Sequence, residues 1–175
     1  MDDEFKVWTT VGSAGTLNQA DLAKVSLHQS IVQLGGDLIG TTGGTTAAPP
    51  AGPGLGTIQA VVRYNVTPVD GLFPADKFKY ALQIRFRNQI AAKLVEVDLA
   101  TGAENQLILF ESKHFPANPN FQVQTVSATT DSKLMDFIAK AYYVEATLTA
   151  PQLAVGHPAE ISIIKILASR DSTTG

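Results

Sequence analysis

The chain has 175 residues, 45% hydrophobic and 17% charged, with a formal net charge of −3 at pH 7 and no cysteine. This length and apolar content fit one folded domain and exclude global disorder, and the lack of cysteine excludes disulfides, thiolate metal sites and thiol catalysis. The mildly acidic charge and the scattered placement of the 13 Lys and Arg residues argue against a nucleic-acid-binding protein, which usually carries a basic excess or stripe.

The N-terminal part of the chain predicts three short strands. Lys6 to Val11 contains β-branched residues beside Trp8, a composition that favours a strand. The glycine-bounded segment 12–15 ends it. Leu22 to Leu27 and Ser30 to Leu34 are expected as two further short strands, joined at His28 and Gln29 by a turn or a bulge.

A segment of different character runs from Gly35 to Gly56. It is rich in Gly, Thr and Pro and has few large apolar residues. Its prolines exclude a central strand, and its composition excludes a packed helix. We therefore expect a long loop, and loops of this length are usually mobile, functional or held by a partner.

The clearest strand runs from Ile58 to Val66, where apolar and polar residues alternate. A period of two is typical of a strand with one buried face. Phe78 to Asn88 alternates in the same way and places Arg85 and Arg87 together on its polar side. The residues of the first strand expected to face the core are Ile58, Ala60, Val62, Tyr64 and Val66.

The segments Ala92 to Leu99 and Gln106 to Glu111 predict a hairpin. Thr101 and Gly102 mark the turn between them, within a loop of typical hairpin length. Glu96 and Asp98 alternate with apolar residues, so both acids are expected on the polar face. The apolar partners in this alternation are Val95, Val97 and Leu99.

The C-terminal part predicts three strands and one ambiguous segment. Phe121 to Ser127 and Tyr142 to Thr149 are expected as strands, and the isoleucine-rich run from Glu160 to Leu167 indicates a strand in a central position or buried on both faces. Asp131 to Ala141 predicts about two turns of helix or a loop. Its apolar residues at helical spacing are Leu134, Phe137, Ile138 and Ala141.

These elements add up to about nine or ten strands joined by short turns and a few long loops. Long helices between the strands are missing, which argues against an alternating α/β fold. We predict an all-β fold, an antiparallel two-sheet sandwich of jelly-roll type, with a closed barrel as second choice. The expected organisation is a single domain over residues 1–175, with the loop at 35–56 and at most one short helix near 132–141.

No motif points to catalysis, a cofactor or a metal. His28, His114 and His157 lie far apart and lack the paired spacing of zinc ligands. The sequence has no Gly-any-Ser-any-Gly nucleophile elbow, and the glycine-rich stretch at 40–46 lacks the lysine of a phosphate-binding loop. We therefore predict no catalytic residue, no cofactor-binding residue and no metal ligand.

Candidate contact residues come from charge and aromatic rings. Arg85 and Arg87 share a strand face, which predicts a small positive patch or an ordinary solvated sheet face. Exposed aromatic rings can also hold sugars, and Phe73 and Phe121 belong to that wider group. The residues singled out for ligand or interface contacts are Trp8, Tyr80, Arg85, Arg87, Phe115 and Tyr143.

The first functional hypothesis is a non-enzymatic, self-assembling structural or interaction protein, such as a fibre, lattice or ring subunit. Sandwich sheets have edges that can pair with other chains, and a weakly charged surface suits packing against further copies. The partner would be a homo-oligomer. A carbohydrate- or glycan-binding module is the alternative, and an enzyme of unknown class is third. We expect no signal peptide and no membrane span, and the compartment stays open.

Overall fold

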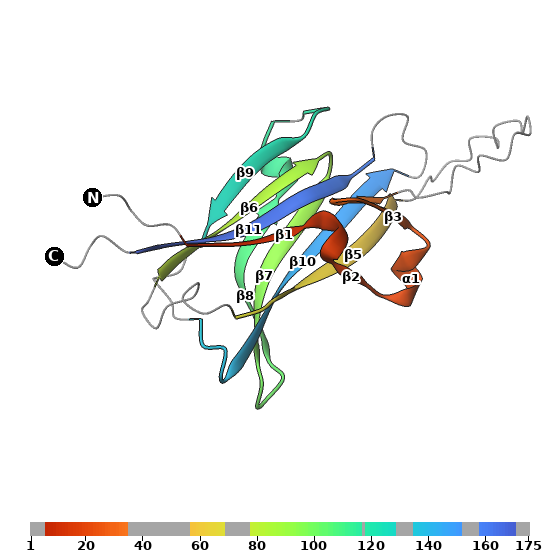
Figure 1. Ribbon diagram of the computed structural model, residues 1–175. Helices are drawn as coiled ribbons and strands as arrows, with labels where there is room; N and C mark the ends of the chain where they lie inside the picture. The colour runs from red at the N-terminus through yellow and green to blue at the C-terminus, as the bar shows by residue number, and fades with distance from the viewer. Residues whose placement is uncertain are drawn as a thin grey trace, which may run out of the picture.

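The computed structural model describes residues 6–34, 57–68, 78–116, 118–128, 135–151 and 158–170. Over these residues the chain forms two antiparallel β-sheets that pack face to face (Figure 1). The predicted all-β sandwich is therefore confirmed. The long segment expected as a loop at 35–56 lies outside the described residues.

Sheet A has six strands and sheet B has five. The strands of sheet A are β1 (Lys6–Val11), β3 (Val25–His28), β4 (Ile31–Leu34), β6 (Phe78–Arg87), β9 (Gln122–Ser127) and β11 (Glu160–Arg170). Those of sheet B are β2 (Thr16–Leu17), β5 (Thr57–Val66), β7 (Ile90–Asp98), β8 (Glu104–Glu111) and β10 (Lys140–Pro151). The neighbours run β3-β4-β11-β6-β9, with β1 also on β11, and β2-β5-β10-β7-β8.

The pairing follows a jelly roll. β4 pairs with β11, β5 with β10, β6 with β9 and β7 with β8, as in one long antiparallel ribbon. Wrapping that ribbon brings β11 beside β6 and β10 beside β7, which closes the two sheets. The isoleucine-rich β11 lies between β6 and the strands β1 and β4, so its predicted central position is confirmed.

The core lies between the inner faces of the two sheets. Alternation in β5 turns Ala60, Val62, Tyr64 and Val66 inward, as predicted. Phe86 of sheet A meets Phe110 of sheet B edge to face, with ring centroids 5.3 Å apart. Each large apolar side chain buried in this way contributes about 1.5–3 kcal/mol, and the core contains more than a dozen of them.

Tight contacts fix the turn after β1. The 3₁₀ turn η1 (Gly12–Ala14) lies against β11 and β4, and the Gly12 amide donates to the carbonyl of Ser30, directly before β4, at 2.9 Å. The Tyr64 hydroxyl, from sheet B, donates to the Gly12 carbonyl at 2.9 Å. A Cβ on Gly12 would lie 2.0 Å from the Ile161 carbonyl oxygen, so this turn needs a glycine for close approach.

The short helix of the described residues differs in position from the expected one. α1 (Gln19–Leu22) contains Leu22, which was predicted to begin a strand, and the Asn18 side chain caps it. Residues 129–134 lie outside the described residues, and Phe137 to Ala139 form a turn before β10. There the Asp136 carboxylate accepts hydrogen bonds from the Ile138 and Ala139 amides, which closes a turn and not a helix.

The predicted facing of β7 was wrong at its second half. Glu96 is buried, on the same inner face as Leu94, and Val95 lies on the outer face of sheet B. The face is fixed by the apolar residues earlier in the strand, because the register with β10 runs without interruption from Ile90 to Asp98. Val95 is still buried, because Tyr143 lies opposite it in β10.

Candidate interaction surface

Two of the predicted aromatic contact residues lie in the core. Trp8 is 8% exposed and Tyr80 is 4% exposed, and both belong to the apolar cluster between the sheets. Their expected role as surface contacts is therefore corrected, because alternation in β1 and β6 turns both rings inward. Phe115 is partly buried and packs on Phe110, with ring centroids 5.3 Å apart.

Arg85 and Arg87 do lie together on the outer face of sheet A, as predicted. Phe121, directly before β9, lies between them, with its ring centroid 4.4 Å from the Arg85 guanidinium carbon and 5.0 Å from that of Arg87. Cation–π contacts of this kind are worth about 0.5–1 kcal/mol at exposed sites. The two arginines therefore hold the beginning of β9 in place.

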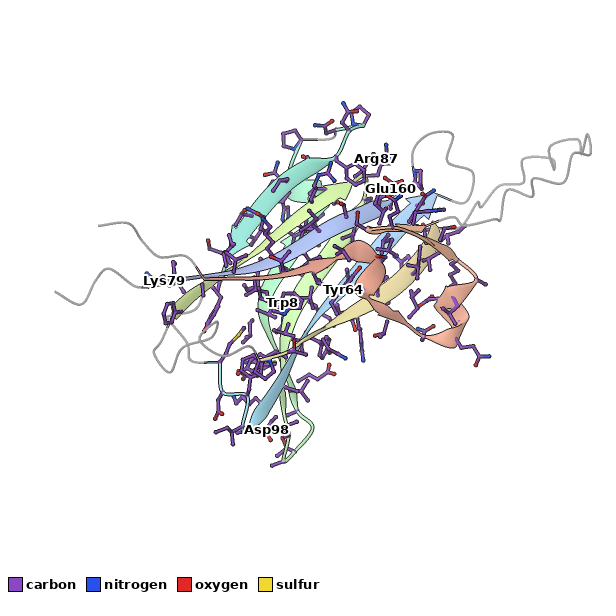
Figure 2. The ribbon with its side chains drawn as sticks, in the orientation of Figure 1. Trp8, Tyr64, Lys79, Arg87, Asp98 and Glu160 are labelled. Carbon is purple, nitrogen blue, oxygen red and sulfur yellow. The ribbon has the colours of Figure 1, made fainter. Side chains whose placement is uncertain are left out.

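Partners from β11 fix both guanidinium groups. The Arg87 Nε donates to Glu160 Oε2 at 2.8 Å, and Arg85 Nη1 donates to the Ser162 hydroxyl at 3.0 Å. Figure 2 shows Arg87 and Glu160 beside each other at the end of sheet A opposite Lys79. The buried carboxylate of Glu160 forms an ion pair with Arg87. This pair partly neutralises the predicted positive patch.

Tyr143 is on the outer face of sheet B, pointing away from the core as predicted, yet it is only 8% exposed. The Arg63 guanidinium carbon lies 4.9 Å from its ring centroid and covers it. Burial raises the pKa of the Tyr143 hydroxyl, and the nearby carboxylate of Glu104 adds to this. Among the described residues no hydrogen bond of normal geometry reaches that hydroxyl.

Glu145 connects the charged side chains on this face. Its carboxylate accepts from Arg63 Nε at 2.7 Å and from Lys93 Nζ at 2.8 Å. Burial alone would raise the pKa of Glu145, but the hydrogen bonds from Lys93 and Arg63 outweigh it, and the pKa lies below its ordinary value. The three charges form a cross-strand network on β5, β10 and β7, which stabilises the sheet.

A buried polar network at one end of the sandwich was not predicted. Glu96 accepts from Lys140 Nζ at 2.6 Å and from the Tyr142 hydroxyl at 3.2 Å. The same hydroxyl accepts from the Asp136 amide at 3.0 Å. The hydrogen bond to Glu96 raises the pKa of Lys140, and burial raises that of Tyr142. The network ties β7 and β10 to the turn before β10.

Asp21 is a second buried acid that sequence reasoning missed. Its carboxylate accepts from Lys24 Nζ at 2.7 Å, from Asn18 Nδ2 at 2.8 Å and from the backbone amide of Val61 at 3.2 Å. Burial opposes ionisation, but these donors prevail and lower the pKa of Asp21. The side chain thus fastens α1 to the free side of β5.

The ionisable groups described so far are engaged in structural pairs. Within the described ranges no cluster of three or more His, Asp or Glu side chains has metal-binding geometry. His28 and His114 are exposed, and His114 Nε2 lies 3.6 Å from Glu111, while His157 lies outside the described residues.

The edges of the sheets differ in how they are protected. β2 pairs with β5 at Val62 and Arg63 only, and Asp21 accepts from the Val61 amide next to them. β8 carries Glu104 and Glu111 at its ends, and its register with β7 is irregular between Leu94 and Val95. Charges and bulges of this kind discourage pairing with another chain.

β9 lacks these protections. It lies at the outer margin of sheet A (Figure 1) and pairs in regular register with β6. Its sequence, QVQTVS, contains no charged residue and no proline. Val123 is 51% exposed, and Thr125 and Ser127 are exposed as well.

Comparison with models of known protein families and with curated proteins finds no match. No helix among the described residues has the length and apolar character needed to cross a bilayer. The function is therefore inferred from the physical features of the chain itself.

Proposed function

We propose that this protein works through its surface as a self-assembling β-sandwich subunit, of a fibre, lattice or ring. The observation that carries the proposal is β9, a margin strand of six residues without charge, proline or bulge. Such a strand presents unpaired backbone groups as a template for another strand. Natural monomers usually protect an edge of this length, so an unprotected one favours a partner.

The weak charge of the chain supports the same proposal. Only 17% of its residues are charged, below the usual quarter. Many of these charges are paired on the sheet faces, as Arg63, Lys93 and Glu145 are on sheet B and Arg87 and Glu160 are on sheet A. Such a surface has little net repulsion between copies.

The fold is compatible with this role but does not by itself indicate it. Jelly rolls build viral shells and also lectin domains, so function has to be argued from surfaces. The glycan alternative has less support, because Trp8 and Tyr80 lie in the core and Arg63 covers Tyr143. A role in catalysis has less support still, because the buried acids serve as structural partners.

Light scattering coupled to size-exclusion chromatography tests the proposal. We expect masses that are multiples of 18.6 kDa and that rise with concentration. Negative-stain electron microscopy of the same fractions would distinguish a ring from a fibre or a lattice. A single mass of 18.6 kDa across the whole accessible concentration range would overturn the proposal.

A further inference from the structure

We propose that two copies of this chain pair through β9, edge to edge about a two-fold axis, with Thr125 opposite Thr125 of the second copy. The inference rests on the proposed function and names one contact of the assembly. A two-fold contact alone closes at a dimer, so a fibre, lattice or ring would use at least one further contact. The occupant of the edge is a second copy of this chain.

The backbone groups that face outward follow from the ladder between β9 and β6. The Ala128 amide donates to the Tyr80 carbonyl at 2.8 Å, and the register places these two residues opposite each other. Successive strand residues direct their N–H and C=O groups to opposite sides. The backbone groups of Val123, Thr125 and Ser127 therefore point away from β6, toward an edge on which no strand of the described residues pairs.

The outward residues are self-complementary. In an antiparallel pair centred on Thr125, Val123 lies opposite Ser127 of the second copy, and Ser127 lies opposite Val123. Residues that directly oppose each other at hydrogen-bonded positions exchange both backbone bonds. Each outward N–H and C=O of the three residues then has a partner. Their side chains form one Thr–Thr and two Val–Ser pairs, without any charge.

A second copy fits this edge because β9 has no charged side chain that would repel the same strand of that copy. A charged edge would place like charges opposite each other around a two-fold axis, and β9 has none. The register between β9 and β6 has no bulge, and a bulge is one of the features that turn an edge strand away from a partner. The paired strands would join two copies of sheet A into one continuous sheet.

β9 is also held in place by contacts within a single copy of the chain. Phe121 is held between Arg85 and Arg87, and Gln83 Nε2 donates to the Thr125 hydroxyl at 3.0 Å. A preordered strand loses less conformational entropy on pairing. Six residues make a small interface, so we expect an affinity of the order of micromolar or weaker for one contact, strengthened when several contacts act together.

The experiment uses charge at the two-fold position. Thr125→Lys places two ammonium groups opposite each other, and Thr125→Glu places two carboxylates there. Each variant alone should raise the dissociation constant of the pair at least about tenfold. An equimolar mixture should restore association, because lysine then meets glutamate. Analytical ultracentrifugation of each variant and of the mixture measures this.

The matched control lies in the same cross-strand row at the opposite margin of sheet A. Thr9 of β1 lies opposite Lys165, Lys165 opposite Gln83, and Gln83 opposite Thr125. Thr9→Glu adds the same charge as Thr125→Glu to an exposed threonine of a margin strand whose one charged residue is Lys6. It should leave the association unchanged.

A second variant separates the loss of pairing from the loss of folding. Thr125→Pro removes a backbone N–H that points outward, and proline is tolerated on edge strands at such positions. It should keep the circular dichroism spectrum of the native protein and weaken association at least about tenfold.

The outcomes separate the two proposals. A wild-type monomer overturns both the pairing and the proposed function. Wild-type assembly that persists in Thr125→Lys and Thr125→Pro overturns the β9 pairing and leaves self-assembly standing. Loss of assembly in both charge variants without recovery in the mixture overturns the two-fold register, and loss only in Thr9→Glu moves the contact to β1.

Discussion

Replacing Gly12 by alanine tests the closest approach between η1 and sheet A. The added Cβ would lie 2.0 Å from the Ile161 carbonyl oxygen and 2.9 Å from the Val32 amide nitrogen. Both contacts are backbone atoms, and Ile161 and Val32 are paired with each other in β11 and β4. Neither atom can move without disturbing the central strand of the sheet.

The turn itself would have to move away by more than about 1 Å to reach an ordinary contact distance. That shift would break the hydrogen bond from the Gly12 amide to Ser30 and the one from the Tyr64 hydroxyl to Gly12, each 2.9 Å long. Overpacking costs about 1–3 kcal/mol, and a buried hydroxyl without a partner costs a further 1–3 kcal/mol or so. We expect Gly12→Ala to lose about 2–6 kcal/mol of the free energy of unfolding.

Urea unfolding monitored by tryptophan fluorescence gives this value, and thermal melting should show a Tm lower by roughly 5–20 °C. Gly102→Ala is the control. Gly102 has a φ of +73° with no atom near its added Cβ, so alanine there costs only the left-handed strain of about 1–2 kcal/mol. A Gly12→Ala protein within about 1 kcal/mol of the wild type would refute the packing argument.

Two further predictions concern the charged networks. Lys140→Met leaves the buried Glu96 carboxylate without its ammonium partner, and urea unfolding should show a loss of about 3 kcal/mol of stability. The double variant with Glu96→Gln should recover much of this loss. Equal stability of Lys140→Met and wild type would contradict the prediction. The pKa of Glu145 is lowered in the folded state, so its contribution is present above the ordinary value of 4.5 and is lost as pH falls through the folded value. Glu145→Gln should therefore be less stable than wild type at pH 7, and the difference should shrink as pH falls below 4.5; a pH-independent difference would contradict the linkage.

The strands were predictable where alternation is long. β5 and β6 each run for ten residues with one face consistently apolar, and both were located within a residue or two at each end. The isoleucines of β11 also revealed its central place, because a strand with neighbours on both sides is buried more completely.

Short elements and individual faces were not predictable. The two-residue β2 and the four-residue α1 each cover only about one period of their own pattern, too little for the pattern to repeat, so tertiary contacts such as Asp21 with the Val61 amide decide them. Glu96 was assigned to the polar face because it alternates with Val95 and Val97, yet it lies inside, where Lys140 and Tyr142 form hydrogen bonds with its carboxylate. No single-sequence signal pairs residues that are more than forty positions apart.

The candidate surface was predictable in part for the same reason. Arg85 and Arg87 share a face by their spacing alone, but Phe121, which lies between them, comes from a strand connection that is distant in sequence. Trp8 and Tyr80 were candidate contact residues because aromatic rings serve both cores and binding faces. Their strand register, which the sequence leaves open by one residue, decides between the two.

The place of β9 at a margin is the step that sequence cannot supply. Its polar and uncharged pattern fits either a central or an edge strand. The structure pairs β9 with β6 on one side, and on its other side no described strand lies next to it. The low charge of the chain therefore matters most at this edge, because β9 has no charged residue. Arg63, Lys93 and Glu145 form pairs on the face of sheet B, where they cannot guard the edge of sheet A. Because β9 has no charged residue of its own, strand pairing at this edge meets no charge repulsion between its side chains, and Thr125 is the residue at which that pairing can be broken or restored.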